Sequence, residues 1–105
     1  MVIERVELSV VAGREAEFEA AMARGTAILA AAAGCTSVSL ARGVERPSRY
    51  LLMLSWRAIE DHTAFTATPG FQQFREAAGP FFAERPAMEH FRPVAASSPD
   101  PASPA

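Results

Sequence analysis

The sequence predicts an α+β domain in which an antiparallel β-sheet carries helices on one face. In four segments hydrophobic residues alternate with a period of two, and between them such residues recur every three or four positions. Gly and Pro residues mark the boundaries between these segments. The resulting order is strand, helix, strand, strand, helix pair, strand, which is the order of a ferredoxin-like sheet.

The composition is that of a single globular domain. The 105 residues are 50% hydrophobic and 21% charged, with a formal net charge of −2, which gives no indication of a nucleic-acid-binding surface. All ten basic residues are Arg, and Cys35 is the single cysteine, so no intrachain disulfide can form. The alternating, charged first ten residues do not resemble a signal peptide, and the longest apolar run is too short to span a bilayer. We therefore expect a cytoplasmic bacterial protein with no membrane partner.

The first strand and the first helix are predicted over residues 2–10 and 14–33. In the strand, apolar side chains at even positions share one face, which Glu4 interrupts. The helix carries an apolar stripe that begins at Phe18, and acidic residues in its first turns suit the helix dipole. Gly34 is a typical residue at which such a helix ends.

Two further strands are predicted over residues 35–45 and 49–57, on either side of a turn at 45–48. The second has two apolar faces, one with Tyr50, Leu52, Leu54 and Trp56 and the other with Leu51 and Met53. Such a strand is expected to be covered on both sides. Since the chain has no second layer left for the outer face, we predict a homodimer packed sheet to sheet.

The remaining elements are two short helices and a last strand. The first helix is predicted over residues 58–67, and the second begins at Thr68-Pro69, an N-cap followed by proline, and ends at Gly79-Pro80. The last strand is predicted over 87–94. The domain therefore spans residues 1–95, and the Pro/Ala/Ser-rich residues 96–105 are expected to form a flexible tail.

Several segments carry a resemblance to a known family: AGREAEFEAA in the first helix, RYLLMLSWRAIEDHTAF, TPGFQQFR, PFF, and the HF pair at 90–91. Together they resemble the antibiotic biosynthesis monooxygenase domain family over about residues 2–94. The resemblance implies a dimeric α/β barrel in which two ferredoxin-like sheets face each other and each protomer has a cleft between sheet and helices. It also implies an activity, because cofactor-free oxygenases of this family convert aromatic polyketide phenols to quinones.

Two histidines are the candidate catalytic residues. His62 lies on a mostly apolar helix face and is expected to point inward, where a neutral imidazole can accept a phenolic proton. His90 alternates with Met88 and Arg92 on the last strand and is the second acid–base candidate. The alternative for His62 is a structural role in the core, and for His90 a place at the sheet end or the dimer seam.

The candidate substrate-binding residues are aromatic, with one cation: Trp56, Tyr50, Phe65, Phe74 and Arg75. Trp56 matches the tryptophan at the strand end of the family and would form a cleft wall against a flat substrate, or a core anchor. Tyr50 shares its strand face and would line the cleft or cover the sheet at the dimer interface. Arg75 would pair with a substrate anion at the cleft mouth, or lie solvated on its helix.

The sequence predicts no metal site and no cofactor. Glu60, Asp61 and His62 are consecutive on a helix, so their side chains project about 100° apart and cannot converge on one ion. A metal site would need His90 as well. In the haem-degrading branch of the family a histidine in the pattern F-x-x-x-H holds the iron, whereas Arg75 stands there in this chain and cannot ligate iron in that way.

The predicted function is that of a cofactor-independent monooxygenase acting on an aromatic or polyketide-like phenol in an apolar cleft. The quinone-forming members place an Asn in the cleft, and this chain contains none, so a donor to the phenol anion must come from another side chain or the backbone. Two alternatives stay open. One is a non-catalytic small-molecule-binding or accessory dimer, and the other is a barrel isomerase or cyclase that uses His62.

Overall fold

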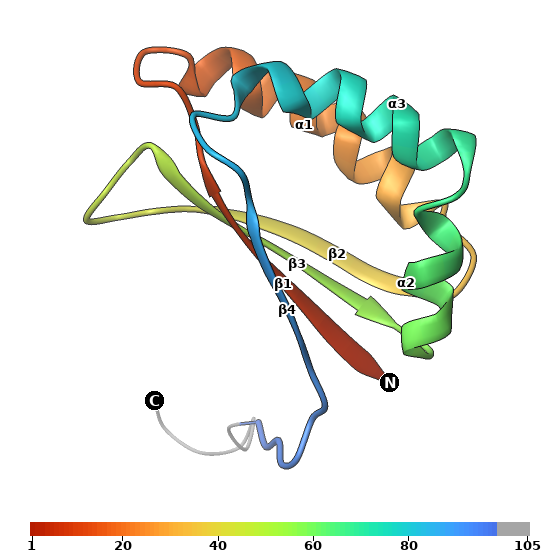
Figure 1. Cartoon of the computed structure of the whole chain (residues 1–105). Helices are drawn as coiled ribbons and strands as arrows, with labels where there is room; N and C mark the ends of the chain where they lie inside the picture. The colour runs from red at the N-terminus through yellow and green to blue at the C-terminus, as the bar shows by residue number, and fades with distance from the viewer. Residues whose placement is uncertain (99–105) are drawn as a thin grey trace.

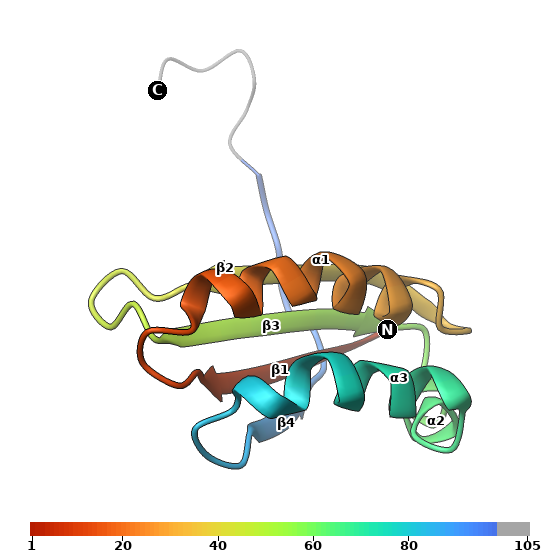
Figure 2. The same cartoon turned by 90° about the horizontal axis from the view of Figure 1, so that it is seen from above.

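The computed structural model describes residues 1–98, and they form one sheet covered by helices. The strands are β1 (Val2–Ser9), β2 (Cys35–Arg42), β3 (Arg49–Trp56) and β4 (Ala87–Phe91), and the helices are α1 (Glu15–Ala30), α2 (Ile59–Phe65), α3 (Pro69–Ala78) and the 3₁₀ turn η1 (Gly79–Phe81). The strand order is β2-β3-β1-β4, with every neighbouring pair antiparallel. Helices α1 and α3 lie side by side over one face of the sheet, and α2 lies near one end of it (Figures 1 and 2). The predicted ferredoxin-like α+β fold is confirmed.

Several predicted boundaries differ from the observed ones, and the largest differences are at the ends of α1, β2 and β4. Helix α1 ends at Ala30 rather than at residue 33, and the chain then turns through Gly34 with φ +84°. Strand β2 ends at Arg42 rather than at 45. Strand β4 ends at Phe91 rather than at 94, because Phe91 already pairs with Ile3 near the start of β1. The predicted tail falls mostly on residues 99–105, which lie outside the described residues.

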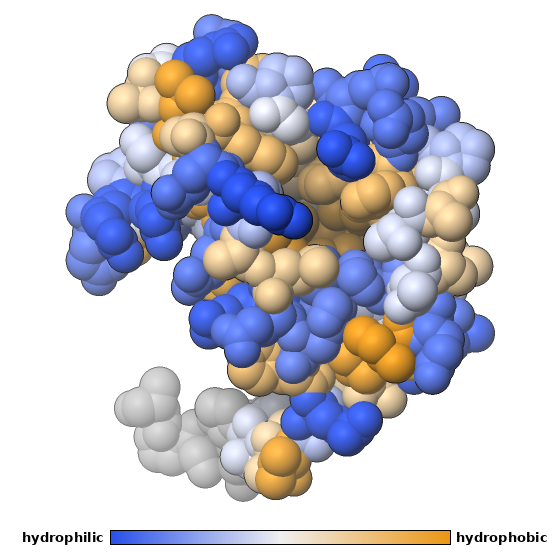
Figure 3. Space-filling view, viewed as in Figure 1, coloured by the Kyte–Doolittle hydropathy of each residue, from blue (hydrophilic) through white to orange (hydrophobic). Residues whose placement is uncertain are grey.

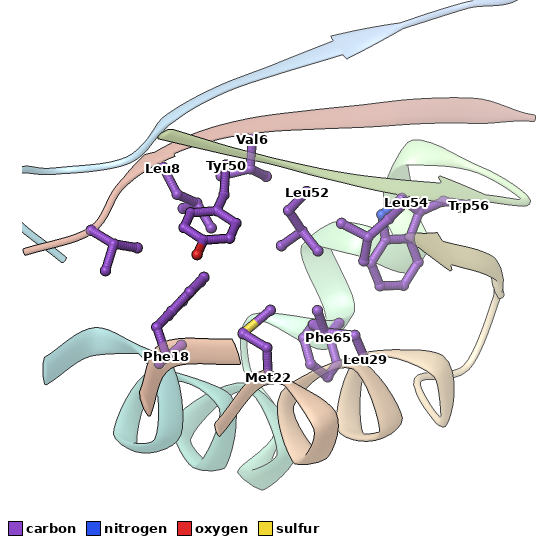
Figure 4. Close-up of a cluster of buried hydrophobic side chains, with 12 residues drawn as sticks. Val6, Leu8, Phe18, Met22, Leu29, Tyr50, Leu52, Leu54, Trp56 and Phe65 are labelled. Carbon is purple, nitrogen blue, oxygen red and sulfur yellow. The ribbon is translucent and has the colours of Figure 1, made fainter. Parts of the chain in front are cut away.

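The hydrophobic core lies between the sheet and the helices. Its largest fully buried side chains are Trp56, Phe18, Leu8 and Met22. Figure 4 shows Phe18 of α1 close to Tyr50 at one end of this layer, with Trp56 and Phe65 towards the other end. The rings of Phe18 and Tyr50 meet edge to face with centroids 4.8 Å apart, a favourable aromatic geometry. Strand β3 therefore contributes its inner face to the core along its whole length.

The opposite face of the sheet carries apolar side chains that no helix within residues 1–98 covers (Figure 1). Leu51 and Met53 of β3 point to this face and are only half-buried. Ile3 of β1 is also half-buried, and Phe91 of β4 is 42% exposed. No helix within the described residues is long and apolar enough to cross a membrane.

Gly34 fixes the approach of α2 to the sheet, and this predicts the outcome of a matched pair of substitutions. A Cβ atom at Gly34 would overlap the Asp61 carboxyl group, whereas a Cβ at Gly13, which also has a positive φ of +91°, would meet no atom within 4 Å. Both Gly34→Ala and Gly13→Ala incur a backbone cost of about 1–2 kcal/mol. We expect Gly34→Ala to lower the free energy of unfolding further, because it also displaces Asp61. Equal losses in urea denaturation would contradict this close approach.

Candidate functional site

Glu4 is a buried carboxylate on β1, at the position where the apolar strand face is interrupted. It is 6% exposed. Its Cα partners are Leu54 on β3 and His90 on β4. Directly paired residues of antiparallel strands project to the same face of the sheet. Glu4 and His90 therefore lie on the helix-covered side together with Leu54.

Trp56 supplies the hydrogen bond that holds Glu4 in place. Its indole Nε1 donates to Glu4 Oε1 over 2.9 Å, and the indole is fully buried. Trp56 pairs with Val2, so it lies diagonally across from Glu4 on the sheet. The bond satisfies both a buried donor and a buried acceptor, which would each cost stability if left alone.

His62 reaches this pair from α2. Its Nε2 lies 3.6 Å from Glu4 Oε1, and its side chain is 13% exposed. The Asp61 carboxylate accepts a hydrogen bond from the backbone N–H of Ala58, which fixes the first turn of the helix. The prediction that His62 points inward is therefore confirmed. Burial lowers the pKa of His62; the Glu4 carboxylate opposes this shift and His90 adds to it, and the net lowering favours the neutral imidazole.

His90 completes a cluster of three titratable side chains. The imidazole rings of His62 and His90 have centroids 4.6 Å apart, and Trp56 packs against His62 with a centroid distance of 5.6 Å. One ligand-type atom from each of Glu4, His62 and His90 lies within 4.8 Å of the other two. His90 Nε2 is buried and has no hydrogen-bond partner among the described residues.

A pocket of about 770 Å³ opens between the sheet and the helices beside this cluster. Figure 3 shows a hollow with a hydrophobic interior and hydrophilic residues around its mouth. The pocket is lined by Val6, Leu8, Leu29, Leu52, Leu54, Phe71, Phe82 and Met88 and, among polar residues, by Glu4, His62, Thr66, Gln72, Arg75, Glu76 and Arg85. An imidazole and a carboxylate therefore form part of the wall of a mostly apolar space.

The candidate residues divide between the pocket and other positions. Trp56, Phe65, Phe74, Arg75 and His62 all line the pocket. His90 packs against His62 and is not among the lining residues.

Tyr50 is not among the lining residues either. It lies near Phe18 (Figure 4), and its hydroxyl donates to Glu19 Oε2 over 2.5 Å. Burial, with a further contribution from this hydrogen bond, raises the pKa of Tyr50 to about 12. Tyr50 thus lies in the core between the sheet and α1, so it occupies neither of the two expected positions, the cleft or the dimer interface.

Glu4 is the site residue that the sequence reasoning did not select. In the sequence Glu4 is visible only as an interruption of the apolar face of the first strand. A single acid at a core position needs a buried partner, and this requirement is the signal that points to it. The partners lie on other elements, with Trp56 separated from Glu4 by 52 residues.

The family model described as antibiotic biosynthesis monooxygenase matches residues 1–77 of this chain. The chain belongs to the antibiotic biosynthesis monooxygenase family. An uncharacterized protein of Bacillus subtilis (strain 168), YczJ, is 33% identical over 95 residues, which are 90% of this chain and 100% of that protein. The resemblance seen in the sequence is therefore confirmed by the family match.

Solved structures of the antibiotic biosynthesis monooxygenase family share the fold. A candidate member from Bordetella bronchiseptica superposes with a TM-score of 0.85 at 36% identity, covering 90% of this chain and 97% of that one. A variant of SnoaB, described as a cofactor-independent oxygenase from Streptomyces nogalater, superposes with a TM-score of 0.78 at 23% identity, covering 94% and 97%. At that lower identity the likeness to SnoaB is a likeness of fold.

The hydrogen bond between Trp56 and Glu4 predicts a measurable coupling energy. We expect Trp56→Phe to lower the free energy of unfolding more in the wild-type chain than in a Glu4→Leu background, because only the former leaves a buried carboxylate without its donor. The difference should be about 1–3 kcal/mol. Urea denaturation followed by circular dichroism, at one fixed protein concentration, measures all four chains of the cycle. Additive losses would show that the bond contributes nothing to stability.

Proposed function

We propose that this member of the family is a cofactor-independent monooxygenase that oxidises an aromatic or polyketide-like phenol. The observation that carries the proposal is the apolar pocket of about 770 Å³ with His62 at one end. Its size suits a drug-sized or polycyclic ligand, and its few polar groups would fix the orientation of that ligand. The description of SnoaB as a cofactor-independent oxygenase supports the same class of reaction.

The proposed reaction needs only the phenol and O₂. His62 accepts the phenolic proton, and the resulting anion transfers one electron to O₂. The two radicals combine at a ring carbon that carries hydrogen, and loss of water from this hydroperoxide leaves a quinone. One oxygen atom enters the product and the other leaves as water, so no external reductant is required. The protein contributes desolvation, orientation and proton transfer.

The pocket residues have distinct roles in this proposal. Trp56, Phe65 and Phe74 form walls against the flat ring system. Arg75 lies at the hydrophilic mouth and pairs with an anionic group of the substrate. His90, which is packed against His62, is the second acid–base residue and acts through its neighbour.

We further propose that the protein works as a homodimer joined through the uncovered face of the sheet. Leu51 and Met53 offer apolar surface there, flanked by Ile3 and Phe91. An apolar face of this kind is stabilised by burial against a second copy. Sheet-to-sheet packing would leave the pocket on the helix side of each protomer.

Oxygen uptake with a panel of polycyclic phenols, in a buffer with EDTA, tests the reaction. We expect turnover with at least one phenol and a loss of about 10²–10⁴-fold in kcat in His62→Gln, because the proton acceptor is removed. The phenol should still raise the melting temperature of His62→Gln, since the pocket walls are unchanged. Glu60→Gln is the matched control, on the same helix but exposed. Full turnover in His62→Gln would refute the role of His62.

Binding without turnover is the second candidate function, and the absence of Asn from the chain favours it. In this case a phenol raises the melting temperature by mass action but no oxygen is consumed. The same panel therefore distinguishes an oxygenase from a small-molecule-binding protein.

The dimer predicts that a charge on the uncovered sheet face separates the protomers. We expect sedimentation velocity at micromolar concentration to give twice the chain mass of 11.2 kDa for the wild type, and the single mass for Leu51→Glu, which would bury a carboxylate directly across from Glu7. Val44→Glu, at a position that is 88% exposed, is the control and should remain dimeric. A wild-type chain that sediments at 11.2 kDa would rule out the dimer.

A further inference from the structure

We propose that Glu4, His62 and His90 form a binding site for a divalent transition-metal ion of the zinc class. The three side chains come from β1, α2 and β4 and converge on one point, with ligand-type atoms that all lie within 4.8 Å of one another. Two imidazoles and one carboxylate are a donor set that zinc sites and non-haem ferrous sites use. Neither the family assignment nor the proposed reaction requires such a site.

The separations suit an ion of this size. Ligands at about 2.0–2.2 Å from a tetrahedral zinc ion lie roughly 3.4 Å from one another. His62 Nε2 and Glu4 Oε1 are already 3.6 Å apart. The remaining separations, none above 4.8 Å, can close by rotation of an imidazole about its side-chain bonds.

The burial of the donors points to a missing partner. His90 Nε2 is buried without a hydrogen bond from any described residue. A buried polar nitrogen without a partner lowers the stability of the fold. Glu4 is a carboxylate that is 6% exposed, and the polar side chains gathered around it are the Trp56 indole and two imidazoles. A divalent cation would satisfy the nitrogen and neutralise the carboxylate at once.

The surroundings of Glu4 also match a metal site. Ligating side chains are held in position by hydrogen bonds from groups that do not touch the ion. The indole N–H of Trp56 holds Glu4 Oε1 in this way, over 2.9 Å. Glu4 and His62 both line the pocket, which provides a path of entry for the ion.

Metal binding and proton transfer at His62 exclude each other. An ion held by His62 occupies the nitrogen lone pair that the proposed reaction needs for the phenolic proton. Zn²⁺ is therefore expected to abolish oxygen uptake when it is added in excess over EDTA. The binding measurement below uses neither phenol nor oxygen, so its failure is distinguishable from failure of the proposed function.

Isothermal titration of the full chain, stripped with EDTA and desalted, tests the site directly. We expect Zn²⁺ to bind with one ion per chain and to raise the melting temperature, and Mg²⁺ to do neither, because it prefers oxygen ligands. Fe²⁺, titrated without oxygen, should bind more weakly than Zn²⁺. The comparison of the Zn²⁺ and Fe²⁺ titrations identifies which of the two ions the donor set favours.

Substitutions of the ligands assign the binding to this cluster. Glu4→Gln, His62→Gln and His90→Gln should each weaken Zn²⁺ binding by more than about tenfold, and Glu4→Gln retains an acceptor for Trp56. Glu89→Gln is the matched control, because Glu89 neighbours His90 on β4 but is exposed and pairs with Arg5 on the other face. Cys35→Ser tests the single thiol as a competing ligand. Both controls should bind Zn²⁺ as the wild type does.

Three outcomes would overturn the proposal. They are no Zn²⁺ binding by the wild-type chain, undiminished binding in all three ligand variants, and loss of binding in Cys35→Ser alone. Melting curves recorded in EDTA confirm that each variant is folded before it is titrated. If one ligand variant is unfolded, the other two still decide the result.

Discussion

The buried carboxylate of Glu4 is the constraint on which this end of the molecule depends. A carboxylate removed from water costs several kcal/mol unless hydrogen bonds and opposite charge compensate for it. Trp56 provides one hydrogen bond, and His62 and His90 are the polar groups nearest to it. The strand that carries Trp56, the helix that carries His62 and the edge strand that carries His90 must therefore meet at one place. A single acidic residue thus ties together three elements that are far apart in the sequence.

Strand β3 connects this cluster to the ordinary core. Its inner face begins at Tyr50, which α1 covers with Phe18 and whose hydroxyl is bound by Glu19. The face ends at Trp56, which packs against His62 and Phe65 of the short helix α2. Between them, Leu52 and Leu54 line the pocket. The inner-face residues of β3 are all apolar or aromatic. Whether a part of the strand belongs to the core or to the site therefore depends on which helix covers it.

The arrangement of the elements could be predicted from the sequence because it depends on local periodicity. Alternation along 49–57 and the Thr68-Pro69 cap are visible in a few neighbouring residues, and both are found in the structure. The site could be predicted only in part. The inward orientation of His62 follows from its helix face, whereas its contact with Glu4 depends on sheet register and on the position of α2, which local patterns do not contain. For the same reason the sequence points to Glu60 and Asp61 as the acids beside His62, whereas the acid beside it in space is Glu4 on another element.

Membership of the family explains the fold and the pocket better than it explains the cluster. A fold can support different chemistries, so the reactive groups of each chain must be considered individually. Here two imidazoles and a carboxylate share one buried space beside an apolar pocket. The same lone pairs can accept a proton or hold a metal ion, and they cannot do both at once. If the proposed phenol and the proposed metal ion both bind here, the one that occupies these lone pairs sets the charge at this part of the pocket, and that charge decides whether a phenol anion is stabilised or the site is blocked.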